Sequence, residues 1–537
     1  KKQKLVLISK GKGDPTHPSS YRPLCMLDVA GKLLEKLIKE RLTKQIERTG
    51  GLSDQQHGFR KGKSTLGALQ DVVLSVQEAQ QGNNFSKKIV LLATLDVRNA
   101  FNSLRWKDIL KALKENFKVS KHMQNIIGSY LSNRTLLYDT ENGTREKSIT
   151  SGAAQGSILG PDLWNITYDD ILQLEMPDST HLVGYADDIA AVITARNVVE
   201  AQRKLNQVML RTRNWLEEHG LSLATEKTEL LLLTKKHINL EVDFNVLGTT
   251  IASKSELKYL GVRFDSRLTF THQIKHAAHK TEKINGMLSK LMANIGGPTQ
   301  MKRKLLMDTT NSVLLYGCEV WGPYFTANCR VKVYRSVQRT SALRVASSYR
   351  TVSYDAITVI SSIIPIDLLI EERCQAFRDR NFSQNNDPTA RREESLLKLQ
   401  LRWQTSSKGR WTARLIPNVS PWYQRRYGEV DYYLTQLLSG HGYFKKYLHK
   451  MGKTDTASCI YDGSIDDAEH TFFQCHRWSW ERAKLAEELH VLELTPENII
   501  PIMLRGKEEW NLVARFAENL LRQKKRDLDV GYNDGQQ

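Results

Sequence analysis

Three aspartates in two apolar segments could hold divalent cations. The tetrapeptide YADD (185–188) lies at the centre of HLVGYADDIAAVIT (181–194), whose two apolar arms predict a hairpin. Asp96 closes a separate apolar run, Lys88–Val97, that has the length of a strand. Carboxylate oxygens with open positions suit Mg²⁺, which keeps water and takes substrate phosphates as its other ligands. Two such ions about 3.5 to 4 Å apart can activate an attacking hydroxyl and stabilise a leaving phosphate oxygen.

The alternative for the paired acids is an ordinary turn. Asp-Asp occurs three times in the chain, at 169–170, 187–188 and 466–467, and an isolated pair of this kind usually lies in a solvated turn. The pair at 187–188 differs in its setting, because a hairpin turn between apolar arms holds its side chains rigidly. We therefore expect this pair, together with Asp96, to do the chemistry.

The elements that must position these acids alternate in type over the first 120 residues. Lys4–Ile8 is expected to be a strand, and a Gly-, Pro- and Ser-rich loop follows it. A helix is then expected between an N-cap at Ser20 and Gly50-Gly51, with an apolar face at 3.6-residue spacing made of Leu27, Leu33, Leu34, Leu37, Ile38 and Leu42. Beyond residue 270 the periodicity is mostly helical, and Lys and Arg are dense. The pattern predicts a mixed N-terminal region followed by a helical one.

The composition indicates a globular protein with a polyanionic partner. At 537 residues the chain is expected to contain about three to four domains. Its 78 Lys and Arg exceed its 59 Asp and Glu by 19, and an excess of this size usually marks a nucleic-acid partner and less often an anionic membrane surface. No run approaches the roughly 18 to 20 apolar residues of a membrane span, and six scattered cysteines form no disulfide framework. We expect an intracellular protein that binds nucleic acid.

Seven motifs in order resemble the reverse transcriptases of non-LTR, LINE-type retrotransposons. They are YRPL (21–24), QHGFRKGKST (56–65), LDVRNAF (95–101), QGSILGP (155–161), YADD (185–188), GLSLATEKTELLL (220–232) and LKYLGVRFD (257–265). LYGCEVWG (315–322) resembles the thumb of that family, and the C-terminal segments resemble the tail of its type-one class of arthropod elements. The resemblance implies an α+β right-hand polymerase with fingers, palm and thumb, followed by a mostly helical C-terminal region with a zinc-knuckle-like segment.

This resemblance assigns a part to each region of the chain. Residues 1–270 would form the fingers and palm, and residues 271–385 a basic helical thumb. Residues 386–450 would form a helical, aromatic and basic segment that binds nucleic acid, and residues 451–537 the knuckle and C-terminal helices. The polar stretch 381–394 is the best candidate for a linker. Three histidines fall on one helical face, namely His272, His276 and His279. They could bind a metal, but we prefer to interpret this helix as a basic thumb helix near the duplex backbone.

The resemblance also implies the catalytic residues. Asp96, Asp187 and Asp188 would bind two Mg²⁺ ions, with Mn²⁺ as a substitute. Lys227 would face the pyrophosphate and donate a proton as it leaves. An isolated lysine would otherwise be a solvated surface residue.

Further residues would contact the incoming deoxynucleotide. The backbone of Val97 would lie against its phosphates, and Phe101 would be a gate whose ring excludes a 2′-hydroxyl. Gln155-Gly156 would touch the nascent pair and the template backbone, with Gly156 allowing close approach. A core aromatic and a plain turn are the alternatives for Phe101 and for the Gln-Gly pair. LKYLGVRFD would hold the primer end as a hairpin.

The segment GFRKGKST nearly spells a phosphate-binding P-loop. That loop needs four residues between its first Gly and the GK[ST] group, but Gly58 and Gly62 are separated by only three, and no apolar strand precedes them. A P-loop NTPase therefore fails on spacing. As a finger motif, Arg60 and Lys61, with Arg22, would contact the triphosphate through charge-assisted hydrogen bonds.

The C-terminal third carries two further candidate sites. Between 409 and 450, aromatic residues alternate with Arg and Lys, which suits base stacking or equally a small helical core with basic faces. Cys459, His470 and Cys475 resemble the family's CCHC knuckle, but Asp462 stands where its second cysteine belongs. Asp can ligate Zn²⁺, although replacing a soft thiolate weakens a structural site, so folding without metal stays open.

The predicted function is an RNA-directed DNA polymerase, a nucleotidyltransferase, that copies element RNA by target-primed reverse transcription. Its partners would be an RNA template, a DNA primer or target DNA, and deoxynucleoside triphosphates, with no membrane involved. The chain opens without Met, so we expect it to be a fragment of a longer protein, and the resemblance implies an N-terminal endonuclease domain in the full polyprotein. The expected location is the nucleus, with a cytoplasmic ribonucleoprotein stage. The alternative is a domesticated or degenerate element protein that binds RNA without polymerising.

Overall fold

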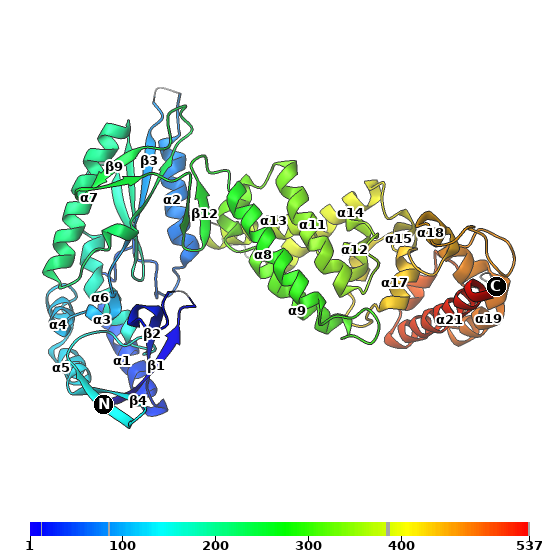
Figure 1. The fold of residues 1–537 in the computed structure, drawn as a ribbon, viewed down its shortest axis with the longest axis horizontal. Helices are drawn as coiled ribbons and strands as arrows, with labels where there is room; N and C mark the ends of the chain where they lie inside the picture. The colour runs from blue at the N-terminus through cyan, green and yellow to red at the C-terminus, as the bar shows by residue number, and fades with distance from the viewer. Residues whose placement is uncertain (12, 84–85, 383–386, 535–537) are drawn as a thin grey trace. The chain divides into compact units, whose positions relative to one another are not determined.

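The computed structural model divides the chain into two compact units, residues 1–270 and 271–537 (Figure 1). It describes all residues except 12, 84–85, 383–386 and 535–537. The division coincides with the boundary expected at 270, and the first unit is mixed while the second is helical. Each unit is described by itself below.

A four-stranded antiparallel sheet forms the centre of the first unit. Its order is β6 (Thr180–Tyr185), β7 (Asp188–Ala195), β3 (Ile89–Asp96) and β8 (Glu229–Leu233). Helix α2 (Thr65–Ala79) packs against β3, β6 and β7, whereas α7 (Val198–Glu218) packs against β7 and β3. Figure 1 shows the two helices on opposite sides of β3. Because both faces are covered, every residue of β3 except Thr94 and Asp96 is buried.

A second sheet has the order β2-β1-β4-β5, in which only β1 and β4 are parallel. The strands are β1 (Lys2–Ser9), β2 (Tyr21–Met26), β4 (Arg134–Thr140) and β5 (Gly143–Ile149). Strand β2 corrects the expectation of a helix from Ser20, because residues 21–26 pair with β1 instead.

Helix α1 (Val29–Arg48) begins later than predicted. Its N-cap is Asp28, whose carboxylate accepts a hydrogen bond from the backbone of Gly31. The predicted apolar face is also partly wrong: Ile38 and Leu42 are buried, but Leu33, Leu34 and Leu37 are exposed. The core therefore contacts a narrower stripe of α1, turned toward its C-terminal half.

The remaining elements of the first unit surround the two sheets. The helices are α3 (Ala100–Ser103), α4 (Trp106–Glu115), α5 (Lys121–Leu131) and α6 (Gly160–Leu172). Two hairpins follow the central sheet in the chain, made of β9 (Asp243–Val246) with β10 (Thr249–Ala252) and β11 (Glu256–Tyr259) with β12 (Val262–Asp265). The second of these is the hairpin that was expected for LKYLGVRFD.

The described part of the second unit consists of helices and short turns without a strand. The helices are α8 (Thr271–Ser289), α9 (Gln300–Leu314), α10 (Cys318–Trp321), α11 (Asn328–Val345), α12 (Tyr354–Ser361), α13 (Ile366–Phe382), α14 (Pro388–Thr405), α15 (Arg410–Leu415), α16 (Val419–Gln424), α17 (Tyr432–Ser439), α18 (Lys445–Lys450), α19 (Ser479–Glu488), α20 (Ile499–Met503) and α21 (Lys507–Asp534). Among the described residues, no helix has the length and apolar character needed to cross a membrane.

One hydrophobic core runs through this unit from Met292 to Leu521. The boundaries expected at 385 and 450 therefore fall within one packed body, and residues 383–386 of the expected linker lie outside the described residues. Two of the aromatic side chains expected near 409–450, Trp422 and Phe444, are fully buried in this core. These two rings therefore belong to a helical core and are not surfaces for base stacking.

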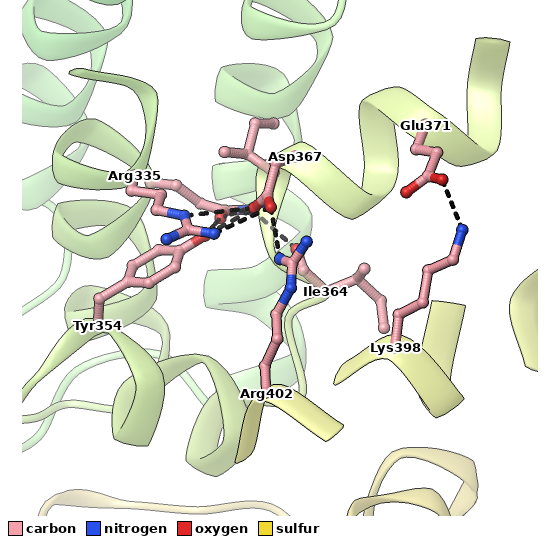
Figure 2. A network of polar contacts seen from close by, with 9 residues as sticks. Arg335, Tyr354, Ile364, Asp367, Glu371, Lys398 and Arg402 are labelled. Carbon is pink, nitrogen blue, oxygen red and sulfur yellow. Dashed lines mark hydrogen bonds and ion pairs between the residues drawn. The ribbon is translucent and has the colours of Figure 1, made fainter. Parts of the chain in front are cut away.

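A partly buried carboxylate joins three helices of the second unit (Figure 2). Asp367 on α13 accepts a hydrogen bond from Arg335 on α11 at 3.0 Å and another from Arg402 on α14. Burial alone would raise the pKa of Asp367, but the hydrogen bond from Arg335 and the charge of Arg402 outweigh it and lower that pKa. Lys398 and Glu371 add a second α13–α14 ion pair at 2.5 Å.

Candidate active site

Strand register brings the three predicted acids to one end of the central sheet. Strands β6 and β7 form the expected hairpin, in which Tyr185 pairs with Asp188 and the turn consists of Ala186 and Asp187. On the other side of β7, Asp96 at the end of β3 is the direct cross-strand partner of Asp188. Directly opposite residues in antiparallel strands have Cα atoms about 4.5 to 5.5 Å apart. The fold thus places a third carboxylate beside the turn.

The electrostatics of the acids show that their charges interact. Loss of hydration, followed by the negative charges of Asp187 and Asp96, raises the pKa of Asp188 to about 6. Loss of hydration also raises the pKa of Asp187, and the charge of Asp96 adds to the rise. Like charges held together by a fold are stabilised by a cation. The donor set consists of oxygens alone, so the residues fit a hard divalent ion.

Lys227 is the cation that contacts this cluster. The backbone of Ala224 donates to the carbonyl of Asp96 at 2.8 Å, and Arg98 donates to Ser222 at 2.9 Å, so the segment 222–224 runs beside the end of β3. A short 3₁₀ turn, Thr225–Lys227, follows. Lys227 Nζ then lies 2.5 Å from Asp96 Oδ2. The structure therefore brings together all four predicted catalytic residues.

Backbone contacts with residues 55–58 support the acidic turn, and the sequence did not predict them. His57 N donates to Gly184 O at 2.8 Å, and Gly184 N donates to Gln55 O at 2.9 Å. A Cβ atom on Gly58 would overlap the backbone nitrogen of Ala186 and would lie 2.9 Å from the carbonyl carbon of Tyr185. Only glycine allows this approach, so the QHG segment is a support for the turn.

Two side chains of α6 complete this support. Trp164 Nε1 donates to Ala186 O at 2.9 Å, and Asn165 Nδ2 donates to Gly58 O at 2.8 Å. Both residues are buried. The sequence signal was an aromatic and an amide side by side in an apolar helix, but that pattern does not reveal which backbone carbonyls they bind.

Two of the residues predicted to contact the nucleotide, Val97 and Phe101, follow directly after β3 in the chain. Val97 is buried and forms an isolated bridge with Leu223. Phe101 on α3 is partly buried and stacks on Trp164 with ring centroids 5.1 Å apart, while Phe59 meets its ring edge-on at 6.4 Å. The ring of Phe101 thus contacts two aromatic neighbours, and its role as a steric gate stays a prediction.

The QGSILGP loop is anchored to the second sheet and to α1. Gln155 O accepts from Cys25 N at 2.8 Å, and a Cβ on Gly156 would lie 2.9 Å from Cys25 O, which explains the glycine and its φ of +100°. Buried Glu35 of α1 accepts a hydrogen bond from Ile158 N at 2.7 Å. The close approach expected of Gly156 is therefore made, in this structure, to strand β2.

The basic residues Arg60 and Lys61 of GFRKGKST differ in their surroundings. Arg60 Nη1 donates to Ser53 O at 2.6 Å, whereas Lys61 is exposed. No strand precedes the motif, since Gln56 makes only an isolated bridge with Gly184, which agrees with the rejection of a P-loop. The nucleotide contacts of Arg60 and Lys61 stay predictions.

Comparison with known proteins identifies the first unit. The model of the family described as reverse transcriptase (RNA-dependent DNA polymerase) matches residues 8–264. Residues 8–264 form a reverse transcriptase domain. A 115 kDa protein in the type-1 retrotransposable element R1DM of Drosophila melanogaster is 28% identical over 96% of this chain and 51% of its own length. The Pol polyprotein of the R1 element of Bradysia coprophila is 27% identical over 88% of this chain and 48% of its length.

More distant relatives align mainly with part of the chain. The RNA-directed DNA polymerase from the mobile element jockey of Drosophila melanogaster is 25% identical over 65% of this chain and 38% of its length. A solved telomerase structure from Candida tropicalis is 14% identical over 49% of this chain and 53% of that one, with a TM-score of 0.36. The chain spans about half the length of the first two relatives.

A second group of possible metal ligands lies outside the reverse transcriptase domain. The ligand atoms of Cys459, Asp462, His470 and Cys475 all lie within 4.8 Å of one another. The two sulfur atoms are 3.9 Å apart, and His470 Nε2 is 3.2 Å from Asp462 Oδ1. His470 Nε2 is buried beside this carboxylate oxygen. The structure thus brings all four predicted knuckle residues together in an arrangement compatible with a metal.

Proposed function

We propose that the chain is an RNA-directed DNA polymerase of a non-LTR retrotransposon and that its reaction is centred on Asp96, Asp187 and Asp188. The observation that supports it most directly is the register of β3 and β7, which puts Asp96 across from Asp188 within a reverse transcriptase domain. The substrates would be deoxynucleoside triphosphates, an RNA template and the 3′-hydroxyl of a DNA primer. Residues 1–270 would act as fingers and palm and residues 271–385 as thumb.

The three carboxylates would hold two Mg²⁺ ions, or Mn²⁺ in their place. When bound, the ions would lower the pKa of the primer hydroxyl and neutralise charge on the phosphates. The primer hydroxyl would give its proton to water as its oxygen forms a bond to the α-phosphorus and the bond from that phosphorus to pyrophosphate breaks. Lys227, now paired with Asp96, would donate its proton to the leaving pyrophosphate.

The neighbours of the acids would select and position the substrates. The fixed ring of Phe101 would exclude a 2′-hydroxyl, since Trp164 and Phe59 leave it little freedom to turn aside. The backbone of Val97 would lie against the triphosphate. Arg60 and Lys61 would bind the triphosphate after leaving their present positions. Gln155-Gly156 would contact the nascent pair and the template backbone. The β11–β12 hairpin would hold the primer end.

The C-terminal cluster would hold one Zn²⁺ ion. Two cysteine sulfurs, an imidazole and a carboxylate would offer four ligands to one ion, a number typical of structural rather than catalytic zinc. The ion would tie the 459–462 turn to the helical turn at His470–Gln474. In the full protein we place the activity in target-primed reverse transcription, with a nuclear step at the chromosomal target.

Primer extension tests the polymerase proposal. The chain should extend a DNA primer on an RNA template with Mg²⁺ and four deoxynucleotides, and Asp187→Ala combined with Asp188→Ala should reduce the rate by about a thousand-fold or more. Asp170→Ala removes an acid from another Asp-Asp pair and should leave the rate unchanged. RNA binding without extension would favour the non-polymerising alternative, and equal extension by the double variant would overturn the assignment of the acids.

A further inference from the structure

A basic hollow in the second unit lies between the start of α9, the end of α12, the segment after α16 and the start of α21. Its volume is about 640 Å³. Four cationic side chains line it: Lys304, Arg425, Arg426 and Lys507. The single acidic residue in the lining, Glu429, already accepts a hydrogen bond from Gln300 N at 3.0 Å. The lining therefore carries a net charge of +3, from four cations and one carboxylate.

Arg425 is the central cation of this pocket, and it lacks a counter-charge. Its guanidinium lies over the rings of Trp422 and Trp510, at 4.1 and 5.0 Å from their centroids. Nη1 donates to Ser362 Oγ at 2.6 Å, while Nε is buried without a partner, and no described carboxylate forms an ion pair with the side chain. Burial lowers the pKa of Arg425 to about 10. A largely desolvated guanidinium of this kind favours an anion beside it.

The surrounding cations extend the positive charge to the surface. Burial lowers the pKa of Lys304, and the charges of Arg425 and Arg392 add to the fall against the opposing effect of Asp308. Lys304 Nζ contacts only the carbonyl of Ser362, at 3.3 Å, among its described partners. Arg426 and Lys507 are exposed at the pocket and form no ion pair with a described carboxylate. The four cations thus line one space in which Glu429 is the single acidic lining residue.

We propose that this pocket binds a backbone phosphate of a nucleic-acid strand. Guanidinium and ammonium groups around one open hollow match the charge and geometry of a phosphodiester. Arg425 lies over the rings of Trp422 and Trp510, and the four cations make a phosphate the favoured contact in this pocket. Recognition here would consequently be of the backbone and independent of sequence. This site lies in the second unit and is separate from the acids of the polymerase proposal.

The test is the salt dependence of binding of the full chain to a fluorescent 20-nucleotide single-stranded RNA. The variant Lys304→Gln, Arg426→Gln, Lys507→Gln removes the three accessible charges and spares the packed Arg425. We expect it to bind about ten-fold more weakly at 150 mM salt, with a slope of log K against log[salt] that is smaller by about 2. The control Lys484→Gln, Arg505→Gln, Arg515→Gln removes equal charge from exposed positions outside this pocket and should change the slope by less than 1. Equal slopes for the two triple variants would overturn the proposal.

A second measurement distinguishes a strand from a small anion. Acetylation of Lys304 and Lys507, read by mass spectrometry, should be slowed by the RNA and much less by inorganic phosphate at the same total phosphate concentration. Equal protection by inorganic phosphate would overturn the strand as the ligand. Primer extension by the unaltered chain tests the polymerase proposal by itself, so failure of that proposal is distinguishable from failure of this one.

Discussion

The acidic turn and the C-terminal Cys/Asp/His/Cys cluster are opposite kinds of candidate metal site. The cluster is largely buried: Cys459, His470 and Cys475 are each less than a tenth exposed, and four ligand atoms lie within 4.8 Å of one another. The three acids offer oxygens only, and among the described residues they do not form a group of that closeness. One site is a nearly complete coordination shell, and the other is an open arrangement of charges.

This difference separates structural from catalytic use of a metal. A complete donor set leaves no position for a substrate, whereas open carboxylates leave positions for phosphate oxygens. The open site must then take its rigidity from the surrounding fold, because a bound ion cannot hold three incomplete ligands in place alone. The contacts of Gly58, Trp164 and Asn165 behind the acidic turn supply that rigidity.

Gly58→Ala should disable the open site most strongly. The added methyl group would overlap the backbone at Ala186 and displace the turn that carries Asp187. We expect primer extension to fall by about a hundred-fold or more, because small displacements of catalytic groups are costly. Gly128→Ala, on a helix with nothing within 4 Å of the new methyl group, should leave the rate unchanged. Normal activity in Gly58→Ala would show that the turn does not depend on this support.

Cys459→Ser should affect the closed site and spare the open one. We expect zinc content, measured by elemental analysis, to fall from about one ion per chain to none. The melting temperature of the chain should fall by about 5 to 10 °C, since the ligands then lose their shared ion within the core. Primer extension at 25 °C should stay within two-fold.

The matched control for this variant is Cys329→Ser, which alters an exposed cysteine outside the cluster and should change neither zinc content nor melting temperature. Absence of zinc from the unaltered chain would contradict the assignment of a structural ion to the cluster.

Most of the acidic site could be predicted from the sequence because its information is local. An apolar strand that ends on Asp96 and a hairpin centred on 187–188 specify the elements, and the resemblance specifies their partnership. The register between β3 and β7 depends on long-range packing, so only the structure places Asp96 opposite Asp188. The support by Gly58 was not predicted for the same reason, because the sequence around Gly58 does not show that it packs against Ala186.

The fold was predictable by region but less so at individual boundaries. Helical periodicity beyond residue 270 correctly indicated the helical second unit. The prediction of a helix over residues 21–26 was wrong because pairing with β1 decides the conformation of this segment. The helical spacing of apolar residues belongs to α1, which begins only at Val29. The aromatic residues near 409–450 were ambiguous because burial, which distinguishes core from stacking surface, is a property of the assembled helices.

Lys227→Ala tests whether a cation is needed beside the open site. We expect kcat for primer extension to fall about ten-fold, because the variant lacks the donor of a proton to pyrophosphate. Lys254→Ala is a matched control, since Lys254 Nζ also lies 2.5 Å from a carboxylate, that of Glu229, and is similarly exposed. Both variants should keep the melting temperature, as surface ion pairs contribute about 0 to 1 kcal/mol. Equal kcat values for the two variants would remove Lys227 from the reaction.

The smallest expected effect is a pH-dependent stabilisation of the open site by Mg²⁺. The pKa of Asp188 in the folded chain, about 6, is above its usual value near 3.9, so the folded state keeps a proton that the unfolded state has lost. Stability from this group is therefore fully present below about pH 4 and is lost as the pH rises through 6, where the ionised carboxylates repel one another. A divalent ion reverses that loss only where the carboxylates are ionised. At pH 7.5, 10 mM Mg²⁺ should raise the melting temperature by about 2 to 4 °C, and at pH 5 by less than 1 °C. Asp188→Asn should melt higher than the unaltered chain at pH 7.5 without Mg²⁺ and should respond weakly when the ion is added. A stabilisation by Mg²⁺ that is equal at both pH values would show that the ion binds elsewhere.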